Sequence, residues 1–254
     1  MTLSLVTVGT GTVVPSATRA SPAHWVEADG LRLLLDCGAG TLHGLARWGL
    51  AWERVTHVAI SHFHPDHYGD LPALLFALRH ATARREPLVV LGPAGTVQLF
   101  RRLADGFGPW LLDPGYPIGV LDVQAGEPFP LGNTGATIDV HATPHTDESV
   151  ALAVECAGGR LVYTGDTGPS EPLAHWASGA DLLLAECSLP DDRALPGHLT
   201  PRSVGKLARA AGAQRLVLTH FYPPVEQVDI RAEVARGYGG PVTLASDGDR
   251  FTLG

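Results

Sequence analysis

Four side chains able to bind metal are packed into six residues in the first third of the chain. They follow the apolar run VAIS and belong to the segment HFHPDH, which contributes His62, His64, Asp66 and His67. A neutral imidazole is a good ligand for Zn, Fe, Ni or Cu, and a carboxylate extends the choice to harder ions such as Mn. Burial of several unpaired polar groups is costly, and a turn between a strand and a helix has no structural need of them. This pattern predicts a metal site, against the alternative that unrelated core or surface histidines cluster by chance.

A single ion in a tetrahedral site cannot use all four groups and still keep an open position for a substrate. A second ion needs further ligands, and we expect them where polar residues follow other strand-like runs. The candidates are His141 or His145 in DVHATPHTDES, Asp166 in LVYTGDTG and His220 in LVLTHFYP. Taken singly, each has an ordinary structural explanation, such as an aspartate in a turn. Together they predict a site for two metal ions.

The elements that must position these side chains are buried strands alternating with helices. Several of the strand-like runs are continuously apolar, which suits strands buried on both faces. The runs are LRLLLDCG, VTHVAISH, PLVVLGP, GATIDVHATPH, RLVYTGD, ADLLLAE and RLVLTH. Two of them resemble each other, because VAISHF and LVLTHF each deliver a histidine followed by phenylalanine. Chance explains so short a likeness as well as two similar halves that bring ligands to a shared cleft.

Helical patterns lie between the strand-like runs. The leucines of one predicted helix follow the i, i+3, i+4, i+7 spacing of a single face, at Leu71, Leu74, Leu75 and Leu78. A second helix is predicted from Thr200 as N-cap, through Pro201 at the first helical position, to a stop at Gly212. Near the end of the chain, Asp247-Gly248 lies between VTLA and RFTL and is typical of a β-hairpin turn.

The composition is that of a chain that folds without disulfides. Its 254 residues are 45% hydrophobic, and no linker or low-complexity tract divides them. We expect one layered domain over residues 1–254, with sheets covered by helices on both outer faces. Three scattered cysteines argue for a reducing compartment, and we see neither a signal peptide nor an apolar run near the ~18–20 residues that span a membrane. These features predict a cytoplasmic location and no membrane partner.

The ligand pattern resembles the metallo-β-lactamase superfamily, and more narrowly its ribonuclease Z and related phosphodiesterase branch. The superfamily resemblance consists of the HxHxDH segment, a later histidine in PHTDES, the TGDT and LTHF segments, and the N-terminal VGTGTVVP and LLLDCGAGT. Glu186 in ADLLLAEC and His198 in GHLTPRSVGKLA resemble the branch's Asp-Leu-Leu-x-x-Glu and His-x-Thr segments. The resemblance covers nearly the whole chain.

The resemblance implies a four-layer αββα sandwich, the metallo-β-lactamase fold, with two divalent ions at one edge of its sheets. Zn is expected, with Mn and Fe as alternatives. The implied ligands are His62, His64 and His145 for the first ion, and Asp66, His67 and His220 for the second, with Asp166 between them. His145 is preferred to His141 because PHTDES occupies the family's ligand position. The resemblance also implies a possible homodimer.

Two such ions about 3.5–4 Å apart lower the pKa of a shared water toward about 7, so a bridging hydroxide can act as nucleophile. Hydrolysis is therefore the expected reaction, with Asp66 counted among the catalytic residues as well as the ligands. A leaving alkoxide needs a proton, and we predict His198 as its donor, with Glu186 holding the imidazole in one tautomer. The alternative is that His198 is an ordinary loop residue.

The expected substrate is a small, cyclic or short nucleotide phosphodiester. Short-form ribonuclease Z proteins carry a Gly/Pro-rich arm that grips tRNA, whereas this chain has only GFGPWLLDPGYPIG at residues 106–119. With a net charge of −8, that omission disfavours RNA. Phe107, Trp110 and Tyr116 either form a lid over the substrate or anchor the segment to the core. The alternatives are tRNA 3′ processing, a lactonase, thioesterase or β-lactamase of the same superfamily, and a non-catalytic metal-binding module.

Overall fold

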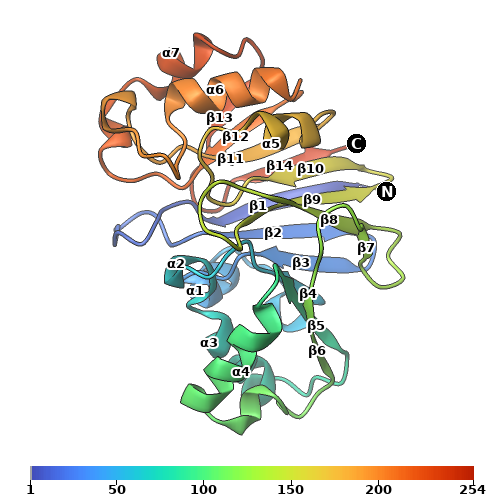
Figure 1. Cartoon of the computed structure of the whole chain (residues 1–254). Coiled ribbons are helices and arrows are strands. Elements are labelled where there is room, and N and C mark those ends of the chain that lie inside the picture. The colour runs from blue at the N-terminus through green and yellow to red at the C-terminus, as the bar shows by residue number, and fades with distance from the viewer. Residues whose placement is uncertain (1) are drawn as a thin grey trace.

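Two seven-stranded mixed sheets form the centre of the computed structural model, which describes residues 2–254. The first sheet has the order β14-β1-β2-β3-β4-β5-β6 and the second β13-β12-β11-β10-β9-β8-β7 (Figure 1). The strands of the first sheet are β1 Leu3–Gly9, β2 Ala23–Ala28, β3 Leu31–Leu35, β4 His57–Ala59, β5 Leu88–Gly92, β6 Ile118–Asp122 and β14 Arg250–Leu253. Those of the second are β7 Phe129–Pro130, β8 Thr137–Ala142, β9 Val150–Cys156, β10 Gly159–Tyr163, β11 Leu182–Glu186, β12 Leu216–Thr219 and β13 Val242–Leu244.

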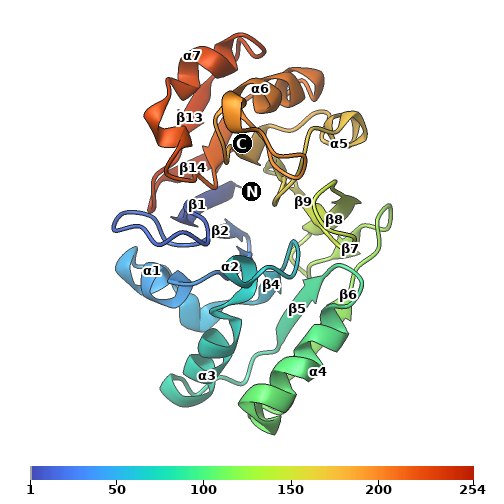
Figure 2. The ribbon, with the colours of Figure 1, turned by 60° about the vertical axis from the view of Figure 1, so that its left-hand side comes forward.

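Helices cover the outer face of each sheet, so the chain forms four layers. Those on the first sheet are α1 Thr41–Arg47, α2 Pro65–Tyr68, α3 Leu71–Ala81 and α4 Thr96–Phe107, and those on the second are α5 Glu171–Trp176, α6 Pro201–Ala210 and α7 Ile230–Ala235. Figure 2 shows α6 and α7 on one side of the molecule and α3 and α4 on the other. Short 3-10 helices span Trp52–Arg54, Pro109–Leu111, Asp191–Arg193 and Val225–Gln227.

Three apolar layers hold this arrangement together. The central layer joins the inner faces of the two sheets, with Leu33 of β3 and Leu184 of β11 both fully buried in it. Each outer layer joins a sheet to its helices, as Leu34 does for the first sheet and Leu183 for the second. Adjacent leucines thus serve opposite faces of one strand, which explains why the strand runs are continuously apolar. The predicted αββα sandwich is confirmed, and the division into a single domain over residues 1–254 stays a prediction.

Strand direction gives both sheets a common functional edge. Strands β3 to β6 are parallel to one another in the first sheet, and β10 to β13 are parallel in the second. The chain leaves parallel strands at one edge, and residues that follow them gather there. The similar runs VAISHF and LVLTHF occupy β4 and β12 with the residues after them, so the two resembling histidines come from different sheets.

Both predicted helices are confirmed. Helix α3 buries its predicted leucines, and α6 begins after the N-cap Thr200, whose side chain accepts from the Ser203 amide in a capping box. The predicted hairpin is wrong. Asp247-Gly248 does form a turn, but β13 pairs with β12 in the second sheet and β14 pairs with β1 in the first. The Asp247 carboxylate accepts from Thr10 and from the Ala20 amide, so the turn is tied to the N-terminal segment while the chain changes sheet.

The segment 106–119 packs mainly against the body of the protein. Trp110 and Tyr116 lie against the outer layer of the first sheet, where the Tyr116 hydroxyl is 3.4 Å from the Leu75 carbonyl oxygen. Of its three aromatic side chains, Phe107 alone is exposed. The anchor hypothesis therefore holds for Trp110 and Tyr116. Within residues 2–254, no helix has the length and apolar character needed to cross a membrane.

Candidate metal centre

The HxHxDH segment gets its shape from a proline. His62 follows β4, and His64 is the N-cap of α2 in an extended conformation, with Pro65 at the first helical position. A residue before proline is restricted to extended backbone, and proline is well suited to begin a helix. His62 and His64 therefore lie two residues apart in extended chain and present their rings to the same side. Asp66 and His67 follow in the single turn of α2 and are buried.

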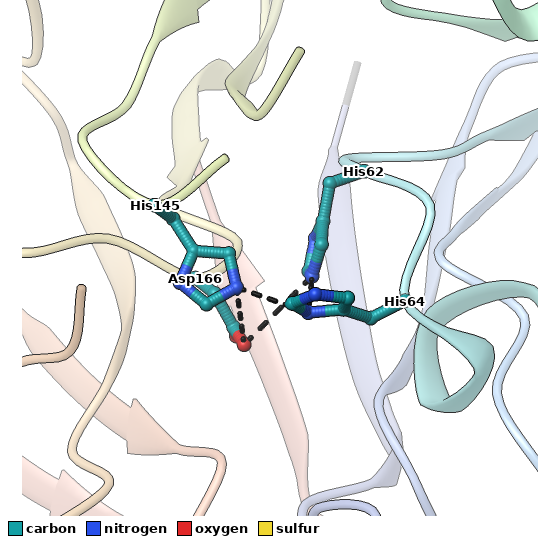
Figure 3. A group of neighbouring side chains, drawn as sticks. All are labelled: His62, His64, His145 and Asp166. Carbon is teal, nitrogen blue, oxygen red and sulfur yellow. Dashed lines mark hydrogen bonds and ion pairs between the residues drawn. The ribbon is translucent and has the colours of Figure 1, made fainter. Parts of the chain in front are cut away.

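The first group of ligand-type atoms joins three histidines and one aspartate from separate segments of the chain (Figure 3). The Nδ1 atom of His64 lies 3.0 Å from His62 Nε2 and 3.1 Å from His145 Nε2. The Oδ2 atom of Asp166 lies 3.9 Å from His62 Nε2 and 3.7 Å from His145 Nε2. Three imidazole nitrogens that converge on one carboxylate oxygen have the donor set and spacing that suit a divalent ion.

The second group faces the other oxygen of the same carboxylate. Asp166 Oδ1 lies 3.5 Å from His67 Nε2 and 3.4 Å from His220 Nε2, and Asp66 Oδ2 lies 3.8 and 3.6 Å from these nitrogens. The Asp166 oxygen and both nitrogens are buried and have no hydrogen-bond partner within residues 2–254. Buried polar atoms without partners are rare and costly. A divalent ion would satisfy all three at once, so the residues fit a second metal.

Asp36 supports the second group and was not predicted from the sequence. Its Oδ2 atom lies 2.7 Å from His67 Nδ1 and also accepts from the Ser61 and Tyr163 hydroxyls, while Oδ1 accepts from the Ser61 amide. An outer carboxylate of this kind orients a ligating imidazole and raises its basicity. The signal was present in LRLLLDCG, where Asp36 follows a buried run just as Asp166 does. Asp36 and His220 also share a left-handed φ of 58°.

The neighbouring charges shift the pKa values of the clustered groups in both directions. Burial opposes ionisation of Asp166, but the charges of His220 and His67 outweigh it and hold the pKa of Asp166 well below its usual range. Burial lowers the pKa of His67, yet Asp166 and Asp36 raise it well above its ordinary value. Burial and the neighbouring His67 lower the pKa of His62, which keeps that ring neutral. A metal ion in the second group would have to displace a proton from His67.

His198 and Glu186 are brought together beside both groups. The Nδ1 atom of His198 lies 3.2 Å from each carboxylate oxygen of Glu186, which is fully buried and also accepts from the Thr167 amide at 2.7 Å. Burial lowers the pKa of His198, but the hydrogen bond to Glu186 outweighs this and leaves the pKa above its ordinary value. The His198 ring lies 4.9 Å from the ring of His145 and 5.9 Å from that of His220.

His141 and His145 have different surroundings. His141 lies on β8, where its ring stacks on Trp176 at 5.4 Å, and it is not among the clustered residues. His145 follows β8, and its Nδ1 donates to the Gly197 carbonyl at 2.8 Å, so Nε2 faces the first group. The structure therefore places His145, and not His141, beside His62, His64 and Asp166, which agrees with the position that the family resemblance implied.

Two more residues at the site escaped the sequence analysis. Ser188 lies fully buried between Glu186 and His220. The Tyr222 ring lies 5.7 Å from the His220 ring and 6.1 Å from the His198 ring, and it is partly exposed. Each stands two residues beyond a predicted site residue, and this spacing was the only signal in the sequence.

Comparison with known proteins identifies the class of protein that has this fold and this cluster. Residues 31–221 match the family model of the beta-lactamase superfamily domain, so the chain belongs to that superfamily. Among curated relatives, the ribonuclease Z of Ignicoccus hospitalis is 30% identical over 281 aligned residues, which cover 91% of this chain and 92% of the relative. The resemblance drawn from the sequence, to the superfamily and its ribonuclease Z branch, is confirmed.

Solved structures agree with this assignment. The metallo-β-lactamase fold protein YhfI from Bacillus subtilis superposes with a TM-score of 0.85 at 25% identity, and the alignment covers 99% of both chains. The short form of human tRNase Z superposes with a TM-score of 0.79, also at 25% identity and with 99% of both chains covered. The chain is thus similar over its whole length to proteins with the metallo-β-lactamase fold.

Proposed function

We propose that this protein is a metal-dependent phosphodiesterase that hydrolyses a small, cyclic or short nucleotide substrate. One observation carries the proposal: the two oxygens of Asp166 face two separate groups of imidazoles, and Asp166 Oδ1, His67 Nε2 and His220 Nε2 have no hydrogen-bond partner within residues 2–254. A carboxylate so placed suits a pair of divalent ions. Membership of a superfamily with relatives named ribonuclease Z supports a hydrolase that acts on phosphodiesters.

The residues that would hold the ions follow from the two groups. His62, His64 and His145 would bind the first ion, Asp66, His67 and His220 the second, and Asp166 both. Zn suits this set of imidazoles and carboxylates, and Mn and Fe are alternatives. When bound, the pair of ions activates water at neutral pH and neutralises charge on the phosphate.

The protein's own groups supply the proton and the positioning. His198 is the proposed donor of the proton that the leaving alkoxide needs, because Glu186 holds its Nδ1 and leaves Nε2 for that proton. Glu186 also favours the charged imidazolium, which can contact a phosphate oxygen. Asp66, whose Oδ2 lies 3.8 Å from His67 Nε2 and 3.6 Å from His220 Nε2, completes the proposed catalytic set.

A small substrate fits the surface better than a folded RNA. The segment 106–119 is short and packs against the body of the protein through Trp110 and Tyr116. The net charge of −8 opposes a polyanion, since RNA binding draws on several contacts between phosphates and basic side chains. The full-length likeness to proteins named ribonuclease Z favours tRNA 3′ processing as the second candidate. A cytoplasmic location and a homodimer stay predictions.

The deciding experiment compares substrates at one concentration of metal-loaded enzyme. We expect turnover of bis(p-nitrophenyl) phosphate and of at least one cyclic or short nucleotide diester, with far weaker cleavage of precursor tRNA. Efficient, salt-sensitive tRNA processing would refute the small substrate. Activity confined to a lactone, a thioester or a β-lactam would refute the phosphodiesterase itself, and no turnover of any of them would indicate a non-catalytic metal-binding module.

A further inference from the structure

The hydroxyl of Ser188 occupies a buried position between the ligand His220 and the carboxylate of Glu186. Its Oγ donates to Glu186 Oε2 and lies 2.8 Å from His220 Nδ1. Ser188 and Glu186 are fully buried, and His220 is 1% exposed. These three side chains are therefore shielded from bulk solvent, and their hydrogen bonds are made within the protein.

The direction of these hydrogen bonds follows from the groups themselves. A carboxylate oxygen without a proton only accepts, and its contact with Ser188 Oγ is shorter than the 3.2 Å to the His220 carbonyl oxygen, so the hydroxyl donates to Glu186. The lone pairs of Oγ are then left for an N–H group. His220 Nδ1 then carries the hydrogen and donates to Ser188. His220 Nε2 consequently has none, and it faces Asp66 Oδ2 at 3.6 Å and Asp166 Oδ1 at 3.4 Å.

The carboxylate of Glu186 also contacts a second histidine, His198. His198 Nδ1 lies 3.2 Å from both of its oxygens, and the Thr167 amide donates to Oε1 at 2.7 Å. The carboxylate thus holds His198 directly and His220 through Ser188. A displacement of this carboxylate would therefore alter the contacts of both histidines.

We propose that Ser188 is a positioning residue that fixes the tautomer of His220 for metal binding and couples the second ligand group to His198 through Glu186. The part of this inference that concerns catalysis rests on the proposed function. The metal-binding part rests only on the contacts of Ser188 and the ligand-type atoms around His220.

A similar serine occurs in the other sheet, which argues against a chance contact. Ser61 Oγ lies 3.0 Å from His62 Nδ1 and donates to Asp36 Oδ2 at 2.8 Å. In each sheet, a buried serine stands between a carboxylate and the Nδ1 of a clustered histidine. The two carboxylates differ in the second histidine that each contacts, which is His67 for Asp36 and His198 for Glu186.

The test measures zinc binding and kinetics in Ser188→Ala. Removal of an outer contact to a ligand typically weakens metal affinity or activity by about 10–100-fold. Chelator competition on the metal-free protein should show one of two stepwise zinc constants weakened by that factor and the other nearly unchanged. The kcat on bis(p-nitrophenyl) phosphate at saturating zinc should also fall, with little change in KM, because Glu186, the partner of His198, loses the hydrogen bond that Ser188 donates.

Two further variants separate positioning from loss of a buried hydroxyl. Ser21→Ala removes a buried serine that donates to the Thr12 carbonyl at 3.1 Å, and it should leave both zinc constants and kcat unchanged. Ser188→Thr keeps the hydroxyl and should restore zinc affinity and kcat. If Ser188→Ala does not fold, Ser188→Cys, which has a weaker donor, should show the same losses to a smaller degree.

The outcomes distinguish this inference from the proposed function. Wild-type zinc constants and kcat in Ser188→Ala, or losses equal to those of Ser21→Ala, would overturn the inference whatever the substrate is. If the wild-type protein hydrolyses no phosphodiester but Ser188→Ala still loses affinity for one zinc ion, the proposed function fails and the role of Ser188 in metal binding stands.

Discussion

Replacement of Asp166 by alanine should affect metal binding more than any other single ligand change. The two oxygens of Asp166 face different ligand groups, with imidazole nitrogens 3.4 to 3.9 Å away on both sides. Under the proposed assignment, Asp166→Ala would therefore remove one ligand from each ion, whereas His64→Ala would remove one ligand from the first ion only. The carboxylate is also ionised, since its pKa lies well below the usual range, so its negative charge is lost as well.

The expected magnitude follows from counting ions. If each lost ligand weakens affinity by at least the 10–100-fold of an outer contact, the loss is at least about 1.4–2.8 kcal/mol per ion. His64→Ala should show that loss once. Asp166→Ala should show it at both ions, about 3–6 kcal/mol in total by the same estimate. The metal content after dialysis should be near two ions per chain for the wild type, near one for His64→Ala and near zero for Asp166→Ala.

The assay is elemental analysis together with zinc competition against a chelator, and circular dichroism controls for folding. Asp166→Asn serves as a second variant, because it keeps the shape and one oxygen donor while losing the charge. Two tightly bound ions in Asp166→Ala would refute the bridging role. Fewer than one ion per wild-type chain after reconstitution with metal would refute the two-metal reading altogether.

Three other predictions test separate parts of the structure. His198→Ala should lower kcat on a phosphodiester by about 10²–10⁴ with metal content unchanged, and loss of metal would instead make His198 a ligand. Asp36→Asn should weaken zinc binding by about 10–100-fold in the same competition assay, because His67 loses its carboxylate partner; unchanged affinity would contradict that support. Burial lowers the pKa of His57 from 6.5 to about 4, so the unfolded chain takes up this proton first as the pH falls. Between pH 6.5 and 4 the metal-free wild type should therefore lose on the order of 3 kcal/mol of stability that His57→Gln retains, as measured by urea unfolding, and parallel curves would disprove it.

Local sequence rules were enough to predict the helices α3 and α6 and to propose one half of the site. The shape of the HxHxDH segment depends on neighbours along the chain, because Pro65 keeps His64 extended and begins α2. The α6 helix likewise begins at its own capping residue, Thr200. His145, Asp166 and His220 could be proposed as partners only as residues after strand-like runs, and the resemblance to a family was needed to assign them to two ions.

Tertiary structure alone decided which distant residues meet and which strands pair. The turn at Asp247-Gly248 has ordinary hairpin residues, yet its two strands join different sheets. A turn sequence sets a local change of direction, whereas strand pairing is chosen by apolar contacts and hydrogen bonds across the whole core. Asp36 and Ser188 became visible for the same reason. Each is a common polar residue after a strand, and only the pairing of that strand with its neighbour in the same sheet places it against the Nδ1 of a clustered histidine.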